Sequence, residues 1–256
     1  MSLERALRAR REQGGKSLVP YLTGGLDGWT RTVEAVAQAG ADGIEVGIPF
    51  SDPVMDGPTI QESSERALAG GATPASVLDE MATLDVGVPL AVMTYVNLVY
   101  RFGWERFART LVASGGAAAI LPDLPLEEAG EWVEAADGAG VETVMLAAPT
   151  SPDERLERIV ERSHGFVYAV GLLGITGERD TLASSAIVIA RRLKELTDLP
   201  VLVGVGISTP AQAVEVCDVA DGVVVGSAVV RRALETGSPE AVAELVGTFR
   251  EALDAG

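Results

Sequence analysis

The residues of this chain that could do acid–base chemistry gather in the segment 43–61, GIEVGIPFSDPVMDGPTIQ. Glu45 alternates with two apolar residues in what reads as a strand, so its side chain faces away from theirs, beside a glycine. Asp56 follows in the loop after that strand. In parallel α/β proteins the carboxyl ends of the strands hold the reacting groups. Glu45 and Asp56 are therefore candidates for moving protons on a substrate.

Each carboxylate also has an ordinary structural explanation. A strand glutamate can be a buried partner of a Lys or Arg, and Asp52 and Asp56 can be turn residues that bond to their own backbone. A glutamate beside a glycine nevertheless needs a reason to leave water, and the combination favours function over structure. After the loop, Thr59 is expected to cap the next helix.

A second kind of site is indicated by glycine-bearing segments that follow the last three expected strands. They are Gly174–Gly177, Gly204–Ser208 and Gly226–Ser227. Glycine lets backbone N–H groups approach an oxyanion closely, and a serine can add its hydroxyl. Taken singly, the glycines could be tight turns and the serines helix caps. Together they predict a phosphate cup. The polar segment 177–185 is expected to be a lid over the substrate or an exposed loop.

The positioning elements are eight apolar runs that alternate with helical patterns. Near-continuous apolar runs indicate strands covered on both faces, and most begin about 25–35 residues apart, the length of a βα repeat. An amphipathic helix over Leu3–Glu12 precedes them, and Trp104–Ala113 shows the clearest helical spacing. The pattern predicts a (β/α)8 TIM barrel with a short N-terminal helix in one domain, 1–256; an open doubly wound sheet is the alternative. The expected strands are Leu18–Thr23, Gly43–Ile48, Leu90–Thr94, Ala118–Leu121, Val141–Ala147, Phe166–Val170, Val201–Val205 and Gly222–Val225.

Composition narrows the classes of partner. A net charge of -17 disfavours nucleic acid, whose phosphates need Lys and Arg. One cysteine, Cys217, cannot form an internal disulfide, and with one histidine it cannot build a Cys/His zinc site. The N-terminal residues lack the apolar stretch of a signal peptide, and no apolar run approaches the length of a membrane span. These features predict a soluble cytoplasmic protein without a membrane or metal partner.

The run EVGIPFSDPVMDGP, residues 45–58, resembles the signature of the tryptophan synthase alpha subunit family. The resemblance covers nearly the whole chain and includes MTYVNLVYRFG at 93–103, PDLPLEE at 122–128, GITG at 174–177, VGVGIS at 203–208 and VVGSAVV at 224–230. Two positions depart from the family. Residues 25–28 read Gly-Leu-Asp-Gly where Gly-Asp-Pro is usual, and Gly171 stands where many members carry Ser. Both positions lie near the expected mouth of the site, where they would affect loop closure and individual contacts with the substrate.

The resemblance implies a TIM barrel that cleaves indole-3-glycerol phosphate into indole and glyceraldehyde 3-phosphate without a metal or a cofactor of its own. It implies Glu45 as the acid–base group and Asp56 as the partner of the indole N–H, with Tyr168 as the family's active-site tyrosine. It implies a beta subunit that carries pyridoxal phosphate, in an α2β2 assembly. It also implies Gly177, Gly206, Gly226 and Ser227 as phosphate ligands, and Thr176 as a residue of the family's mobile loop.

Three alternatives remain compatible with parts of this pattern. A stand-alone lyase that releases free indole would use the same chemistry. A catalytically silent subunit that activates a partner enzyme has no need to retain both Glu45 and Asp56. Another phosphate-sugar barrel, such as an isomerase, would share the phosphate cup without needing that pair of carboxylates.

Overall fold

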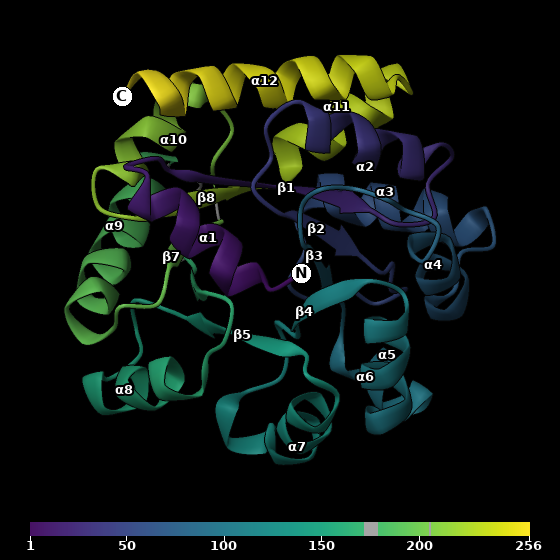
Figure 1. Cartoon of the computed structure of the whole chain (residues 1–256), viewed down its shortest axis with the longest axis horizontal. Helices are drawn as coiled ribbons and strands as arrows, with labels where there is room; N and C mark the ends of the chain where they lie inside the picture. Colours follow the sequence, from purple (N-terminus) through teal and green to yellow (C-terminus); the bar gives the residue numbers. More distant parts are fainter. Residues whose placement is uncertain (172–178, 205) are drawn as a thin grey trace.

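The computed structural model describes residues 1–171, 179–204 and 206–256. Eight strands, all parallel to their neighbours, close into a barrel in chain order, with β1 paired to both β2 and β8 (Figure 1). The predicted barrel is thus confirmed, and an open sheet is excluded because β1 and β8 pair in register from Ser17 opposite Gly222. The strands are β1 Ser17–Thr23, β2 Ile44–Gly47, β3 Leu90–Met93, β4 Gly116–Ile120, β5 Glu142–Ala147, β6 Val167–Ala169, β7 Val201–Val203 and β8 Gly222–Val225.

Helices surround the barrel, and α12 lies across α2, α10 and α11 on its outer side (Figure 1). Their apolar faces and the outward residues of the strands form one continuous core between helices and sheet. The helices are α1 Leu3–Glu12, α2 Trp29–Gln38, α3 Pro58–Ala69, α4 Pro74–Met81, α5 Val96–Phe102, α6 Trp104–Ala113, η1 Leu126–Glu128, α7 Gly130–Ala139, α8 Asp153–Arg162, α9 Arg179–Leu196, α10 Pro210–Cys217, α11 Ser227–Thr236 and α12 Pro239–Ala255.

A second, smaller core fills the inside of the barrel. Because side chains alternate along a strand, every second residue points inward. Leu3 and Leu7 of α1 are fully buried against these inward residues. Helix α1 therefore closes the amino-terminal end of the barrel, and the opposite end is left for the site. The buried inward residues of this cluster are Val19, Ala91, Ala118, Ile120, Val144, Phe166, Tyr168, Leu202 and Val224.

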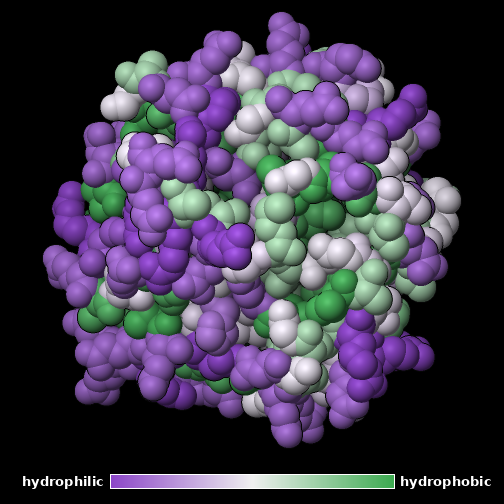
Figure 2. Space-filling view, viewed as in Figure 1, coloured by the Kyte–Doolittle hydropathy of each residue, from purple (hydrophilic) through white to green (hydrophobic). Residues whose placement is uncertain are grey.

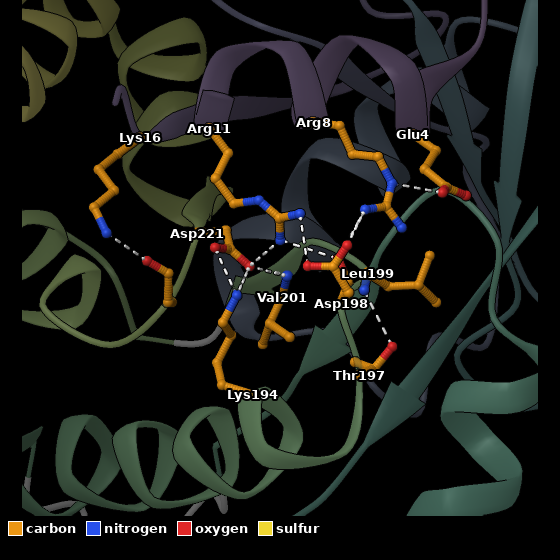
Figure 3. Close-up of polar contacts among 11 residues, drawn as sticks. Glu4, Arg8, Arg11, Lys16, Lys194, Thr197, Asp198, Leu199, Val201 and Asp221 are labelled. Carbon is orange, nitrogen blue, oxygen red and sulfur yellow. Dashed lines mark hydrogen bonds and ion pairs between the residues drawn. The ribbon is translucent and has the colours of Figure 1, made fainter. Parts of the chain in front are cut away.

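Polar contacts hold α1 in place at both of its ends. At its start, the Glu142 carboxylate accepts the backbone N–H groups of Leu3 and Glu4 at 2.9 and 3.1 Å. Farther along, Arg8 and Arg11 both reach Asp198, at 2.7 and 3.1 Å (Figure 3). The carboxylate at the favourable helix N-terminus and the arginines together anchor α1 across the barrel floor.

A buried aspartate links α1 to the strands β7 and β8. Asp221, just before β8, pairs with Lys194 of α9 at 2.8 Å and accepts the backbone N–H of Val201 at 2.9 Å (Figure 3). Arg11 lies 3.7 Å from the same carboxylate. Hydrophilic residues cover most of this face of the molecule, with apolar residues gathered to the right of its centre (Figure 2). In the described part of the chain no helix is long and apolar enough to cross a membrane.

The structure corrects two local expectations. Helix α3 begins at Pro58 with Gly57 as its N-cap, so Thr59 lies inside the first turn and does not cap it. Proline favours this first position because its missing N–H is not needed there. The segment 177–185, expected as a lid or exposed loop, is helical from Arg179 onward as part of α9. The predicted bounds of α1 and α6 are confirmed, and Cys217 is buried.

Candidate active site

Glu45 lies inside the barrel on β2, where it is fully buried. Neither of its carboxylate oxygens has a hydrogen-bond partner among the described residues, and no Lys or Arg pairs with it there. Burial raises its pKa to about 8, and the nearby charge of Asp56 adds to the rise. A buried carboxyl group is normally satisfied by partners. The raised pKa of Glu45 instead favours its protonated form at neutral pH, and both of its oxygens lack a partner among the described residues.

Asp56 lies in the loop between β2 and α3, and Gln61 fixes this loop by donating to the Asp56 backbone carbonyl at 2.8 Å. Burial raises the pKa of the Asp56 carboxyl, while a hydrogen bond from the Tyr95 hydroxyl opposes that rise. The same hydroxyl accepts the backbone N–H of Met55 at 3.0 Å, and the Tyr95 ring lies 5.1 Å from that of Phe50. Tyr95 therefore ties the Asp56 loop to the end of β3.

Two tyrosines near Glu45 lean over glycines at or just after the carboxyl end of the next strand. Tyr168 of β6 occupies the volume above Gly204, and Tyr21 of β1 does the same above Gly47. A methyl group at either glycine would collide with the tyrosine hydroxyl. Burial, and the negative charge of Glu45 and Asp56, raise the pKa of both phenols, so they stay neutral. The sequence Glu-x-Gly on β2 thus supplies the acid and the room for an aromatic neighbour.

The expected phosphate-binding residues Gly226 and Ser227 lie at the start of α11. Its first residue, Ser227, is exposed, and its N-cap Gly226 offers no side chain to cap the free N–H groups. The start of α10 differs, because Thr209 and Gln212 cap each other there, and Gln212 also accepts the Ser208 N–H at 2.9 Å. An uncapped helix N-terminus attracts anions. The geometry therefore favours α11 as the anion site.

The structure brings most of the sequence-predicted site residues to the carboxyl end of the barrel. Gly206 follows β7 with φ +84°, a backbone conformation that glycine adopts readily. Gly177 and Thr176 lie outside the described residues. Sequence reasoning missed Tyr21 and Tyr95. Each sits at or just beyond the carboxyl end of a strand, and that position was the available signal.

Comparison with known proteins decides the family. The sequence profile described as tryptophan synthase alpha chain matches residues 7–253. This chain belongs to the tryptophan synthase alpha chain family. It is 45% identical to the alpha chain of Streptomyces coelicolor over 98% of this chain and 94% of that one. It is 42% identical to the alpha chain of Thermobifida fusca over 99% and 97%.

Solved structures agree with the family assignment. Tryptophan synthase from Mycobacterium tuberculosis superimposes with a TM-score of 0.90 at 38% identity, over 99% of this chain and 98% of that one. The alpha subunit from Legionella pneumophila gives 0.89 at 31% identity over the full length of both. Members of the tryptophan synthase alpha chain family are lyases that split indole-3-glycerol phosphate into indole and glyceraldehyde 3-phosphate, a retro-aldol reaction of tryptophan biosynthesis. They use no cofactor of their own and work with a beta subunit.

Proposed function

We propose that Glu45 is the acid–base group of this retro-aldol cleavage. Indole leaves as a carbon leaving group only when its C3 atom gains a proton. Glu45, protonated at neutral pH, donates that proton to C3. As the bond between C3 and the glycerol chain breaks, the neighbouring hydroxyl becomes an aldehyde and gives its proton to the Glu45 carboxylate. One buried carboxyl group thus serves both proton transfers and ends the cycle protonated.

Asp56 is the partner proposed for the indole N–H. Protonation at C3 places positive charge on the indole nitrogen, and an ionised carboxylate stabilises that charge more strongly than a neutral group does. The hydrogen bond from Tyr95 helps to keep Asp56 ionised. The two carboxyl groups therefore have separate proposed roles, Glu45 as the proton donor and Asp56 as the partner of the indole N–H. Tyr168 is proposed to form one wall of the site.

For the phosphate group we propose the N-terminus of α11, with the backbone of Gly226 and Ser227, together with Gly206 and the family-matched Gly177. Thr176 is proposed for the loop that closes over the substrate. The observation that carries the whole assignment is the fully buried Glu45 whose two oxygens lack a partner among the described residues.

The test is indole release from indole-3-glycerol phosphate by matched isosteric variants. Glu45→Gln is expected to lower kcat about 10²–10⁴-fold, the usual contribution of a positioned acid or base. Asp56→Asn is expected to be severely impaired as well. Glu65→Gln, a substitution at an exposed glutamate of α3, is the control. Near-normal turnover by Glu45→Gln would exclude the assignment.

The loop that carries Asp56 is also the proposed docking surface for the beta subunit. Val54 and Met55 expose 80% and 51% of their surface, and Tyr100 of α5 exposes 68%. Apolar side chains this exposed on one loop are typical of a surface that a partner covers. We propose an α2β2 assembly in the cytoplasm, built on one barrel domain spanning 1–256. Pyridoxal phosphate belongs to the beta subunit, which would take up the indole.

Addition of the beta subunit is expected to raise the rate of indole-3-glycerol phosphate cleavage, because the docking loop and Asp56 share one segment. Asp52→Ala, at an exposed residue of that loop, is expected to weaken the activation more than basal turnover. Equal rates with and without the beta subunit, and no complex in size-exclusion chromatography, would point to a stand-alone lyase instead.

A further inference from the structure

Helix α5 begins just beyond the carboxyl end of β3, and a distant carboxylate caps it. Its N-cap residue, Tyr95, makes no side-chain hydrogen bond to the first turn. The backbone N–H of Val96, the first residue of the helix, donates instead to the Asp123 carboxylate at 2.9 Å. Asp123 lies 27 residues farther along the chain, in the loop after β4. Because a first-turn N–H has no partner within its own helix, Asp123 supplies what the local sequence lacks.

Asp123 is itself held in a fixed place by a turn. The backbone N–H of Leu124 donates to the Leu121 carbonyl at 3.2 Å, which closes the turn around Asp123. This turn follows β4, the strand paired to β3. Just beyond the end of β3, the Thr94 N–H donates to the Ile120 carbonyl of β4 at 3.1 Å. The turn and the start of α5 are therefore anchored on two adjacent strands of the barrel.

The side chain of Tyr95 contacts the loop that carries Asp56. Its hydroxyl oxygen accepts the backbone N–H of Met55 at 3.0 Å, and its ring lies 5.1 Å from the ring of Phe50. Tyr95 is almost fully buried. A closely packed ring cannot shift independently of its backbone. The position of the start of α5 therefore sets where the Tyr95 hydroxyl meets Met55, the residue directly before Asp56.

We propose that Asp123 is a positioning residue for Asp56, acting through the start of α5 and the hydroxyl of Tyr95. The inference rests on the proposed role of Asp56 as the partner of the indole N–H. Two hydrogen bonds, one on each side of Tyr95, connect the Asp123 turn to the Asp56 loop. Because positive charge on the indole nitrogen develops only during the reaction, a displaced Asp56 lowers kcat more than it changes KM.

The kinetic test separates the hydrogen bond from the charge. Asp123→Ala removes the acceptor of the Val96 N–H, and it is expected to lower kcat about 10–100-fold with KM within about threefold, the scale of a slightly displaced catalytic group. Asp123→Asn keeps an acceptor oxygen and is expected to hold kcat within about threefold of wild type. In a Tyr95→Phe background, Asp123→Ala is expected to change kcat less than about twofold, because Asp123 acts through the Tyr95 hydroxyl.

Glu142 offers a matched control at the opposite end of the barrel. Its carboxylate accepts the backbone N–H groups of Leu3 and Glu4 at the start of α1, as Asp123 does at the start of α5. Glu142→Ala removes the same kind of cap far from the reacting groups. It is expected to lower the midpoint of thermal unfolding and to leave kcat within about twofold of wild type.

Amide hydrogen exchange, followed by NMR on the folded chain, supplies a readout that needs no turnover. Asp123→Ala is expected to speed exchange about tenfold at Met55 as well as at Val96, because both amides lose their fixed acceptors. A cap with only a local role would change Val96 alone.

Unchanged exchange at Met55 would overturn the proposal, as would Asp123→Ala turnover within about twofold of wild type, the span allowed to the control. An equally large loss in Asp123→Asn would also overturn it, and so would a full loss that persists in the Tyr95→Phe background. Failure of the proposed function would show differently, as normal turnover by Asp56→Asn while exchange at Met55 still depends on Asp123.

Discussion

The burial of Glu45 lowers the free energy of unfolding, and this loss of stability can be measured. The carboxyl group has an ordinary pKa of 4.5, and in the folded chain that value rises to about 8. Below pH 4.5 both the folded and the unfolded chain are protonated at this position, so it contributes no difference. Between pH 4.5 and 8 the unfolded chain ionises while the folded chain does not, so stability falls as pH rises. Above about pH 8 both are ionised and the penalty stays constant.

The size of the effect follows from the same two values. At about 1.4 kcal/mol for each tenfold change in a proton equilibrium, the rise corresponds to at most about 4–5 kcal/mol at pH 8. Glu45→Gln removes the titration and keeps the shape. We therefore expect this variant to be more stable than wild type at pH 8 by a few kcal/mol, with the difference shrinking steadily toward pH 5.

The assay is urea unfolding of both chains at pH 5, 6, 7 and 8, monitored by circular dichroism, with free energies from linear extrapolation. Glu65→Gln, at an exposed position of α3, controls for the loss of one charge and should show no such trend. A stability difference that does not change with pH, or a Glu45→Gln variant less stable than wild type at pH 8, would refute the reasoning. Either result would mean that the Glu45 carboxyl group makes a stabilising interaction in the folded chain.

Two further predictions concern the other parts of the site. Tyr95→Phe removes the hydrogen bond that lowers the pKa of Asp56, so the acidic limb of the kcat profile should move to higher pH; an unmoved limb would mean that Tyr95 does not control this carboxyl. Inorganic phosphate should compete with the substrate, and Gly206→Asp, which adds a negative side chain to the cup, should raise KM and weaken that competition. Because residue 206 has φ +84°, the substitution should also lower thermal stability by a modest amount. Absence of competition at high phosphate concentration would count against the cup.

The barrel could be predicted from sequence because its strands are buried on both faces. Each strand reads as an apolar run, and all eight were located to within about two residues of their ends. The sequence does not predict the start of α9, because residues 177–185 are polar and lack strong helical spacing. Thr59 resembles a helix cap, but Pro58 is the better signal, because proline often occupies the first position of a helix.

The candidate site could be predicted only in part. A carboxylate in an apolar strand is conspicuous, so Glu45 was evident from its neighbours alone. Tyr21 and Tyr95 were not, since a tyrosine in an apolar segment looks like any other core residue. Tyr21 is distinguished by filling the space above Gly47, and Tyr95 by its hydrogen bond to the Asp56 loop. Both are contacts between strands or loops that only the closed barrel creates.

Helix α1 has a consequence for how the chain reaches its folded state. Leu3 and Leu7 precede the whole barrel in the sequence, yet their partners include Leu202 of β7 and Val224 of β8. The charged contacts of α1 at Asp198 and Asp221 are equally distant in sequence. Contacts this far apart close late, because a long loop must be ordered before they form. The apolar side of this amphipathic helix therefore stays uncovered until nearly the whole barrel has been synthesised. Docking of α1 then completes the fold.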